Sequence, residues 1–188
     1  MKKKPLFAVL AALVILGGCI PVSLNSFYSD KDITFDPALV GQWGEKDDGS
    51  SVSFQQAGAN AYWLIDLKAD STLKFDVHLF TLGGKRFLDL YPKSTGVVMN
   101  DLLEMHLIRA HTLLRVDQIS PTLITASFSE KWLKELLAKD PKALPHVITN
   151  DQIVLTATTA ELQAFLLKHL ATEGAFEKPS ETNRVETK

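Results

Sequence analysis

From residue 39 onward, hydrophobic and polar residues alternate along much of the chain, which is the pattern of β-strands with one buried face. The clearest stretch is 72–82, where Phe75, Val77 and Leu79 alternate with polar or charged residues. Gly83-Gly84 follows, and this pair suits a tight hairpin turn because glycine tolerates positive φ. The same alternation predicts further strands at 51–56, 62–68, 86–91, 107–118, 123–128 and 148–157.

Two stretches, residues 129–139 and 158–173, have instead the spacing of amphipathic helices. Each begins with a capping-box pattern, Ser127 with Glu130 in the first and Thr158 with Glu161 in the second. We expect the later helix to pack on the outer wall or edge of the sheet and the earlier one to cap an opening. The whole pattern predicts a mainly β fold, an antiparallel up-and-down β-barrel or a strongly curved sheet, with two helices.

The predicted domain covers residues 39–176, and the regions on either side of it lack this periodicity. Residues 19–38 are interpreted as a tether, although apolar residues such as Phe27 would let part of it dock on the domain. Residues 177–188 are interpreted as a polar, frayed tail.

Residues 1–18 have the parts of an export signal. Lys2–Lys4 give a positive start, and Leu6–Leu16 is an apolar stretch too short to span a bilayer. The run Leu16-Gly17-Gly18-Cys19 then resembles the lipobox of bacterial lipoproteins, with Gly17 departing slightly from the usual Ala or Ser. The single cysteine of the chain occupies the position that carries lipid in that family.

This resemblance implies that a peptidase cuts between Gly18 and Cys19 and that acyl chains on Cys19 anchor the protein in a membrane. Each buried methylene contributes ~0.8 kcal/mol, so several chains hold firmly. In lipoproteins of bacteria with two membranes, an Asp after the cysteine commonly retains the protein in the inner membrane, and here Ile20 stands there. We therefore expect the outer membrane, facing the periplasm, in such a host, and otherwise the extracytoplasmic face of the cell membrane.

Gly41-Gln42-Trp43, at the entry to the first strand, resembles the Gly-x-Trp signature of lipocalins. In that family the tryptophan closes one end of a β-barrel, often beneath an arginine from a late strand. The resemblance implies that Gly41 and Trp43 close a barrel here, with either Arg109 or Arg115 as the covering arginine. The wider stretch also resembles uncharacterised bacterial lipoproteins.

Charge and composition exclude several classes of partner. The signal holds three of the 20 basic residues and no acidic one, so its removal leaves 17 basic and 22 acidic residues, a net charge of −5 that disfavours nucleic acid. One cysteine excludes an intramolecular disulfide and a cysteine metal cluster.

The residues with catalytic or metal-binding side chains show no pattern that assigns them a reaction. The five histidines lack metal-binding spacing, and His169 is interpreted as a packed imidazole on the apolar stripe of a helix. Asp66, Asp76 and Asp89 are interpreted as a solvated strand face. We expect no metal site, no cofactor and no catalytic residue.

We consider two functions of different kinds. The expected one is a lipid-anchored envelope module that binds a small hydrophobic or amphipathic ligand, which a barrel of about eight strands can hold. Alternatively, the chain is a structural or interaction lipoprotein that contacts another envelope protein without a small ligand. An enzyme is the third alternative.

Overall fold

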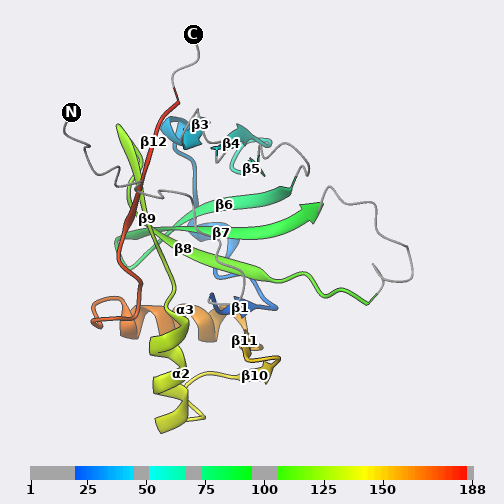
Figure 1. Cartoon of the computed structure of the whole chain (residues 1–188), viewed down its shortest axis with the longest axis vertical. Helices are drawn as coiled ribbons and strands as arrows, with labels where there is room; N and C mark the ends of the chain where they lie inside the picture. The colour runs from blue at the N-terminus through cyan, green and yellow to red at the C-terminus, as the bar shows by residue number, and fades with distance from the viewer. Residues whose placement is uncertain (1–19, 45–50, 67–72, 95–105, 186–188) are drawn as a thin grey trace, which may run out of the picture.

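The computed structural model describes residues 20–44, 51–66, 73–94 and 106–185. Twelve strands of the described part form one sheet, and two α-helices lie together at one side of it (Figure 1). The mainly β fold with two helices is therefore confirmed. The strands are β1 (Val22–Ser23), β2 (Ile33–Thr34), β3 (Gly41–Gly44), β4 (Ser51–Gln56), β5 (Tyr62–Asp66), β6 (Lys74–Leu82), β7 (Lys85–Ser94), β8 (His111–Gln118), β9 (Thr122–Ser127), β10 (His146–Thr149), β11 (Gln152–Leu155) and β12 (Ser180–Asn183). The helices are α2 (Glu130–Lys139) and α3 (Thr159–His169), with short 3-10 turns η1 (Asp30–Asp32) and η2 (Pro37–Leu39).

Strands β3 to β9 form an antiparallel meander in which each strand pairs with the next along the chain. Gly83 and Gly84, with φ of 57° and 74°, make the β6–β7 turn as the sequence predicts. Positive φ at both positions matches the twist of the two strands that they join.

Strand β8 has two neighbours along one edge, one for each half of its length. Its first two residues pair with β1, and residues from Leu114 onward pair with β9. Beyond β1 the sheet continues through β11, which is parallel to β1, to β10 at its edge. The sheet therefore divides at β8 into a curved meander and a three-stranded extension made of β1, β11 and β10.

The two ends of the meander meet without a continuous ladder. Strand β12 pairs with β9, and beyond its last residue Arg184 forms an isolated bridge with Trp43 of β3. One further backbone hydrogen bond, 2.9 Å long, runs from the Val185 N–H to the Gln42 carbonyl. The sheet curves strongly but is not closed into a barrel, so the barrel alternative of our prediction is not confirmed.

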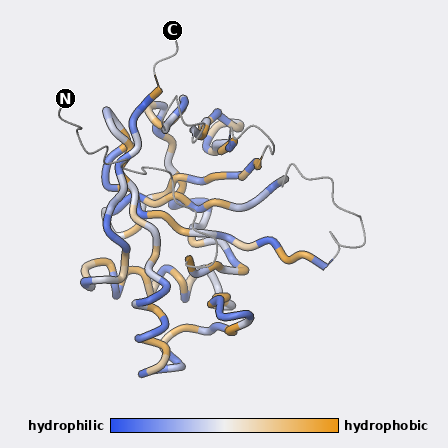
Figure 2. The backbone as a smooth tube through the Cα atoms, viewed as in Figure 1, coloured by the Kyte–Doolittle hydropathy of each residue, from blue (hydrophilic) through white to orange (hydrophobic). Residues whose placement is uncertain are grey.

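The alternation along the strands separates two hydrophobic cores on opposite faces of the sheet, and along β6 to β8 hydrophobic and hydrophilic positions alternate (Figure 2). The inner core lies inside the curve of the meander and contains Leu39, Trp43, Phe54, Tyr62, Leu64, Val77, Leu79, Leu88, Leu90, Leu114, Val116, Ile119 and Leu123. The outer core lies between the other face and the helices and contains Phe27, Phe80, Leu82, Phe87, Leu113, Phe128, Leu133, Leu137, Leu144, Ile153, Leu155, Ala157, Leu162, Phe165 and Leu166.

Both helices pack in the outer core. This confirms the position expected for α3, but α2 contributes Leu133 and Leu137 to the same layer and does not cap an opening. The capping box of α3 is confirmed. That of α2 is wrong, because β9 continues to Ser127 and the cap is Ser129, whose hydroxyl accepts from the Trp132 N–H. Among the described residues, no helix is long and apolar enough to cross a membrane.

Over their described residues, 20–38 and 177–185, the interpretation of the two flanking regions as a tether and a frayed tail is wrong. Pro21, Ser23 and Phe27 are buried, and β1 lies inside the sheet between β8 and β11. Residues 180–183 form β12, with Thr182 only 3% exposed. Strands this short are held largely by backbone hydrogen bonds to their neighbours, so they need few apolar residues and leave little periodic pattern.

We expect Leu162→Ala to lower the free energy of unfolding by about 2–5 kcal/mol, because it removes a 1% exposed side chain from the outer core. Leu167→Ala, on the same helix but 47% exposed beside Gly83, is the matched control and should lower stability by clearly less, about 1 kcal/mol. Urea denaturation of both variants measures the difference. Equal effects would mean that α3 is not docked on the sheet.

Candidate functional site

The meeting point of β3 and β12 contains the residues of the Gly-x-Trp motif. The Trp43 side chain is fully buried, and its indole N–H donates to the Leu39 carbonyl over 2.8 Å. The Arg184 guanidinium lies 4.7 Å above the centre of the Trp43 ring, which is cation–π geometry. The same group donates hydrogen bonds of 2.5 and 3.0 Å to the carbonyls of Ala38 and Val40. Arg184 therefore joins the end of the chain to the turn that precedes β3.

Gly41 has a physical reason to be glycine. Its φ of +141° is a conformation that side-chain-bearing residues rarely adopt. A Cβ at this position would overlap the Arg184 guanidinium. In this motif, Trp43 therefore provides the ring that Arg184 covers, and the missing side chain of Gly41 leaves room for the Arg184 guanidinium.

The covering arginine is neither of the two that the sequence suggested. Arg115 is bound to Asp117 through two hydrogen bonds of 2.7 and 2.9 Å, and its guanidinium lies over Phe176. Arg184 takes the place by the ring, although the region that contains it reads as a tail. The sequence gives no pattern that predicts a strand before Arg184, because Ser180–Asn183 is entirely polar.

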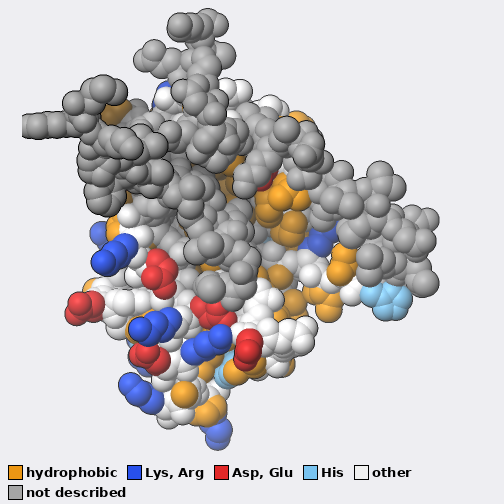
Figure 3. Space-filling view, in the orientation of Figure 1, with side chains coloured by type: hydrophobic (Ala, Val, Ile, Leu, Met, Phe, Trp, Pro, Cys, Tyr) orange, Lys and Arg blue, Asp and Glu red, His pale blue; other side chains and the backbone are white. Residues whose placement is uncertain are grey.

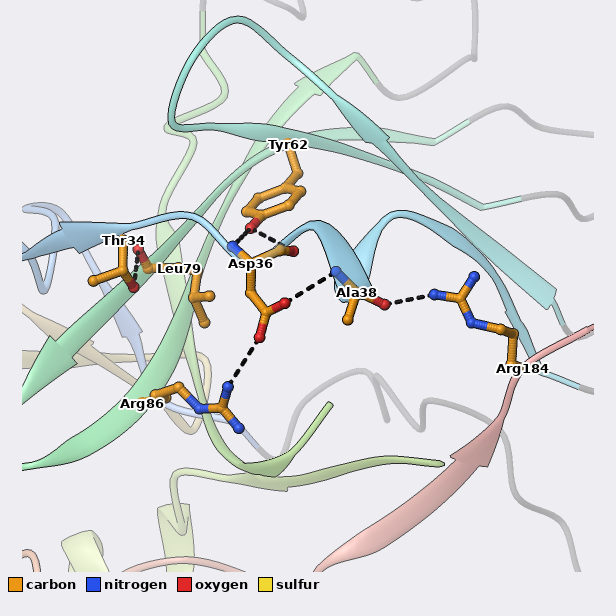
Figure 4. A network of polar contacts seen from close by, with 7 residues as sticks. All are labelled: Thr34, Asp36, Ala38, Tyr62, Leu79, Arg86 and Arg184. Carbon is orange, nitrogen blue, oxygen red and sulfur yellow. Dashed lines mark hydrogen bonds and ion pairs between the residues drawn. The ribbon is translucent and has the colours of Figure 1, made fainter. Parts of the chain in front are cut away.

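Asp36 organises the turn beneath this cluster (Figure 4). One carboxylate oxygen accepts from the Ala38 N–H at 2.9 Å, and the other pairs with Arg86 at 3.2 Å. The Tyr62 hydroxyl accepts from the Asp36 N–H at 2.7 Å and donates to the Asp36 carbonyl at 3.1 Å. Burial is the main cause that raises the pKa of Tyr62, so the phenol stays protonated and keeps this donor.

A second polar cluster lies on the outer face, around Asp89. This side chain is 1% exposed, and its two oxygens accept from the Phe27 N–H at 2.8 Å and contact His111 Nδ1 at 2.6 Å. The expectation of a solvated face is therefore wrong for Asp89, because the N-terminal segment covers it. His78, cross-strand from Asp89, stacks on Tyr28 with ring centres 4.5 Å apart.

Both carboxylate oxygens of Asp89 bind groups of this chain, the Phe27 N–H and the His111 ring. A carboxylate that orients an imidazole also occurs in general bases. Here the same carboxylate holds the Phe27 backbone, so its clearest role is to pin the N-terminal segment to β7 and β8. Within the residues that the structure describes, no group of three or more His, Cys, Asp or Glu side chains is arranged to hold a metal ion.

The remaining candidate side chains have ordinary structural surroundings. His169 packs between Trp132 and Phe165, with ring centres 5.0 and 4.6 Å away, and burial lowers its pKa. This agrees with its interpretation as a packed imidazole. Asp76 forms an ion pair with Lys93 at 3.3 Å.

Cys19, the predicted lipid-attachment residue, and Gly18, which precedes it at the predicted cleavage site, lie outside the described residues. The described chain begins at Ile20, and Pro21 is already buried. No protein-family model, no curated protein and no solved structure matches this chain.

We expect Gly41→Ala to destabilise the fold by about 3 kcal/mol, from backbone strain and displacement of Arg184 from Trp43. Gly58→Ala is the matched control, because Gly58 also has positive φ (+78°) but an added Cβ would meet nothing within 4 Å. The control should cost about 1 kcal/mol. Urea denaturation gives both values, and equal costs would remove the role assigned to the close approach of Arg184.

Stability should fall as the pH drops below about 6.5, in part because of His78. Burial lowers the pKa of His78 in the folded protein, opposed by Asp89, Asp76 and Asp30. As the pH falls, the unfolded chain therefore binds this proton before the folded protein does. The stability that neutral His78 contributes is fully present above its ordinary pKa and is lost as the pH falls from there through the lowered pKa of the folded protein. A single proton gives a slope of at most ~1.4 kcal/mol per pH unit. Chemical denaturation between pH 7 and 5 should show a shallower fall for His78→Asn than for wild type, and identical slopes would contradict this.

Proposed function

We propose that the protein is a lipid-anchored lipoprotein of the cell envelope whose domain acts through its surface, as a structural or interaction module for another envelope protein. The observation that carries the second part is the inner core. Trp43 and Tyr62 are fully buried there, and Phe54 is 2% exposed. These large side chains pack with the aliphatic residues of the neighbouring strands where a carrier would hold its ligand.

The lipobox-like run Leu16-Gly17-Gly18-Cys19 supports the anchor. Since Ile20 is not an acidic retention signal, the proposed location is the outer membrane, facing the periplasm, in a host with two membranes. In a host with one membrane it is the extracytoplasmic face of the cell membrane.

We also infer that the meander corresponds to a lipocalin-type barrel that its own side chains fill and whose ladder stays open between β3 and β12. Strands β3 to β9 and β12 follow one another around the inner core, and Arg184 with Trp43 joins the two edges. The Gly41-Gln42-Trp43 motif supports this inference, because its glycine and tryptophan lie in the contact between those edges. A barrel filled by its own side chains offers partners its outside and its rim.

Mass spectrometry of the intact protein, purified in detergent from membranes of its own host, tests both parts. Wild type should have the mass of residues 19–188 plus acyl groups, with no small molecule retained under native conditions. Cys19→Ala is the control, and it should lack the acyl mass. Acyl mass on Cys19→Ala would contradict the anchor, and a bound amphipathic molecule at full occupancy would favour the ligand carrier instead.

A further inference from the structure

In the extension of the sheet formed by β1, β11 and β10, the face toward the outer core is covered at β1 and β11 but not at β10, where Ile148 is 60% exposed, and the other face is open. Ile153 and Leu155 of β11 point into the outer core, where the helices cover them. The alternate residues point the other way. Val147, Val154 and Val22 are direct neighbours across the three strands, and Thr112 of β8 continues the row. We call these four residues the valine row.

The valine row is apolar and accessible. Val147 is 51% exposed, and Val22, Val154 and Thr112 are half-buried. Leu24, the residue after the end of β1, is 42% exposed. On the same face, Thr149 and Gln152 pair at the end of the hairpin. None of these side chains is charged.

The surface over the two helices, in contrast, is rich in charged side chains. Lysine, arginine, aspartate and glutamate side chains gather over the lower part of the molecule in Figure 3, where α2 and α3 lie in Figure 1. A charged side chain is costly to bring into the apolar boundary of a bilayer, whereas Val, Leu and Thr are not. The open face of the extension is therefore suited to lipid, and the helical layer is suited to water.

The lipid-bearing residue is fixed close to this face by covalent geometry. Two residues, Ile20 and Pro21, lie between Cys19 and Val22, and each of the three steps along the chain spans at most about 3.6 Å, so the two Cα atoms lie within about 11 Å of each other. Val22 itself belongs to the valine row. Because Pro21 is buried and β1 is paired on both sides, no flexible tether separates the domain from its anchor.

We propose that the valine row and Leu24 rest on the membrane, with β10 and β11 in the headgroup region of the bilayer that the acyl chains of Cys19 enter. This rests on the proposed lipid anchor and adds the orientation of the domain. Apolar contact brings the face to the bilayer, because the mature chain, at −5, is not attracted to anionic lipid by its net charge. The face turned to the bilayer is unavailable to a protein partner.

Site-directed spin labelling of the acylated protein in phosphatidylcholine vesicles tests this. The only native cysteine is the acylated one, so an added cysteine is the single free thiol. Val147→Cys places a nitroxide on the valine row. Leu167→Cys is the matched control, since Leu167 is 47% exposed but lies on α3, across the sheet. Accessibility to oxygen and to a water-soluble nickel complex is measured for each label with and without vesicles.

On vesicles, the label at position 147 should become severalfold less accessible to nickel and more accessible to oxygen, while the label at position 167 should not change. Two water-accessible labels on a protein whose acyl mass is intact would overturn the orientation and leave the anchor standing. A photoreactive crosslinker, attached to the Val147→Cys variant in place of the nitroxide, that captures a protein in intact cells would also overturn it, because a partner would then occupy the face. A protein without acyl mass that does not float with vesicles would remove the anchor, and this inference with it.

Discussion

Strand β8 shares one edge between two partners, and much of the architecture follows from this division. Where β9 pairs with its later residues, the sheet curves back toward β12 and β3 and encloses the inner core. Where β1 pairs with its first residues, the sheet instead continues outward through β11 and β10. The same strand thus supplies Leu114 and Val116 to one core and Leu113 to the other, because successive side chains point to opposite faces.

The two ends of the described chain are fastened by polar contacts beside apolar cores. At the N-terminal end, the buried carboxylate of Asp89 accepts the Phe27 N–H and holds His111. At the C-terminal end, Arg184 covers Trp43 and donates to the carbonyls that precede Gly41. A buried carboxylate is costly unless its oxygens are satisfied, so Asp89 stabilises only one arrangement of the segment that covers it. The contacts of Asp89 and of Arg184 each select one arrangement of the chain, since each joins residues more than 60 positions apart.

The proposed lipid anchor would be joined closely to the domain. A lipoprotein on a long, flexible linker samples many orientations. Here Pro21 is buried and β1 is an internal strand of the sheet, so a domain anchored at Cys19, as proposed, would have few orientations. The fold would then set which surface a partner can reach.

The sequence by itself determined the elements with a strong local pattern. The period-two alternation located the strands of the meander, Gly83-Gly84 located a turn, and the Thr158–Glu161 box located the start of α3. The resemblance to the lipocalin motif also drew attention to Gly41 and Trp43, and the structure brings both against Arg184. These results depend on neighbours in the chain, which periodicity and capping rules describe.

Only the tertiary structure decided which arginine covers Trp43, why Asp89 is buried, and that residues 22–23 and 180–183 belong to the sheet. Those features come from pairings between distant segments, and a short strand held by backbone hydrogen bonds leaves almost no trace in the identity of its side chains.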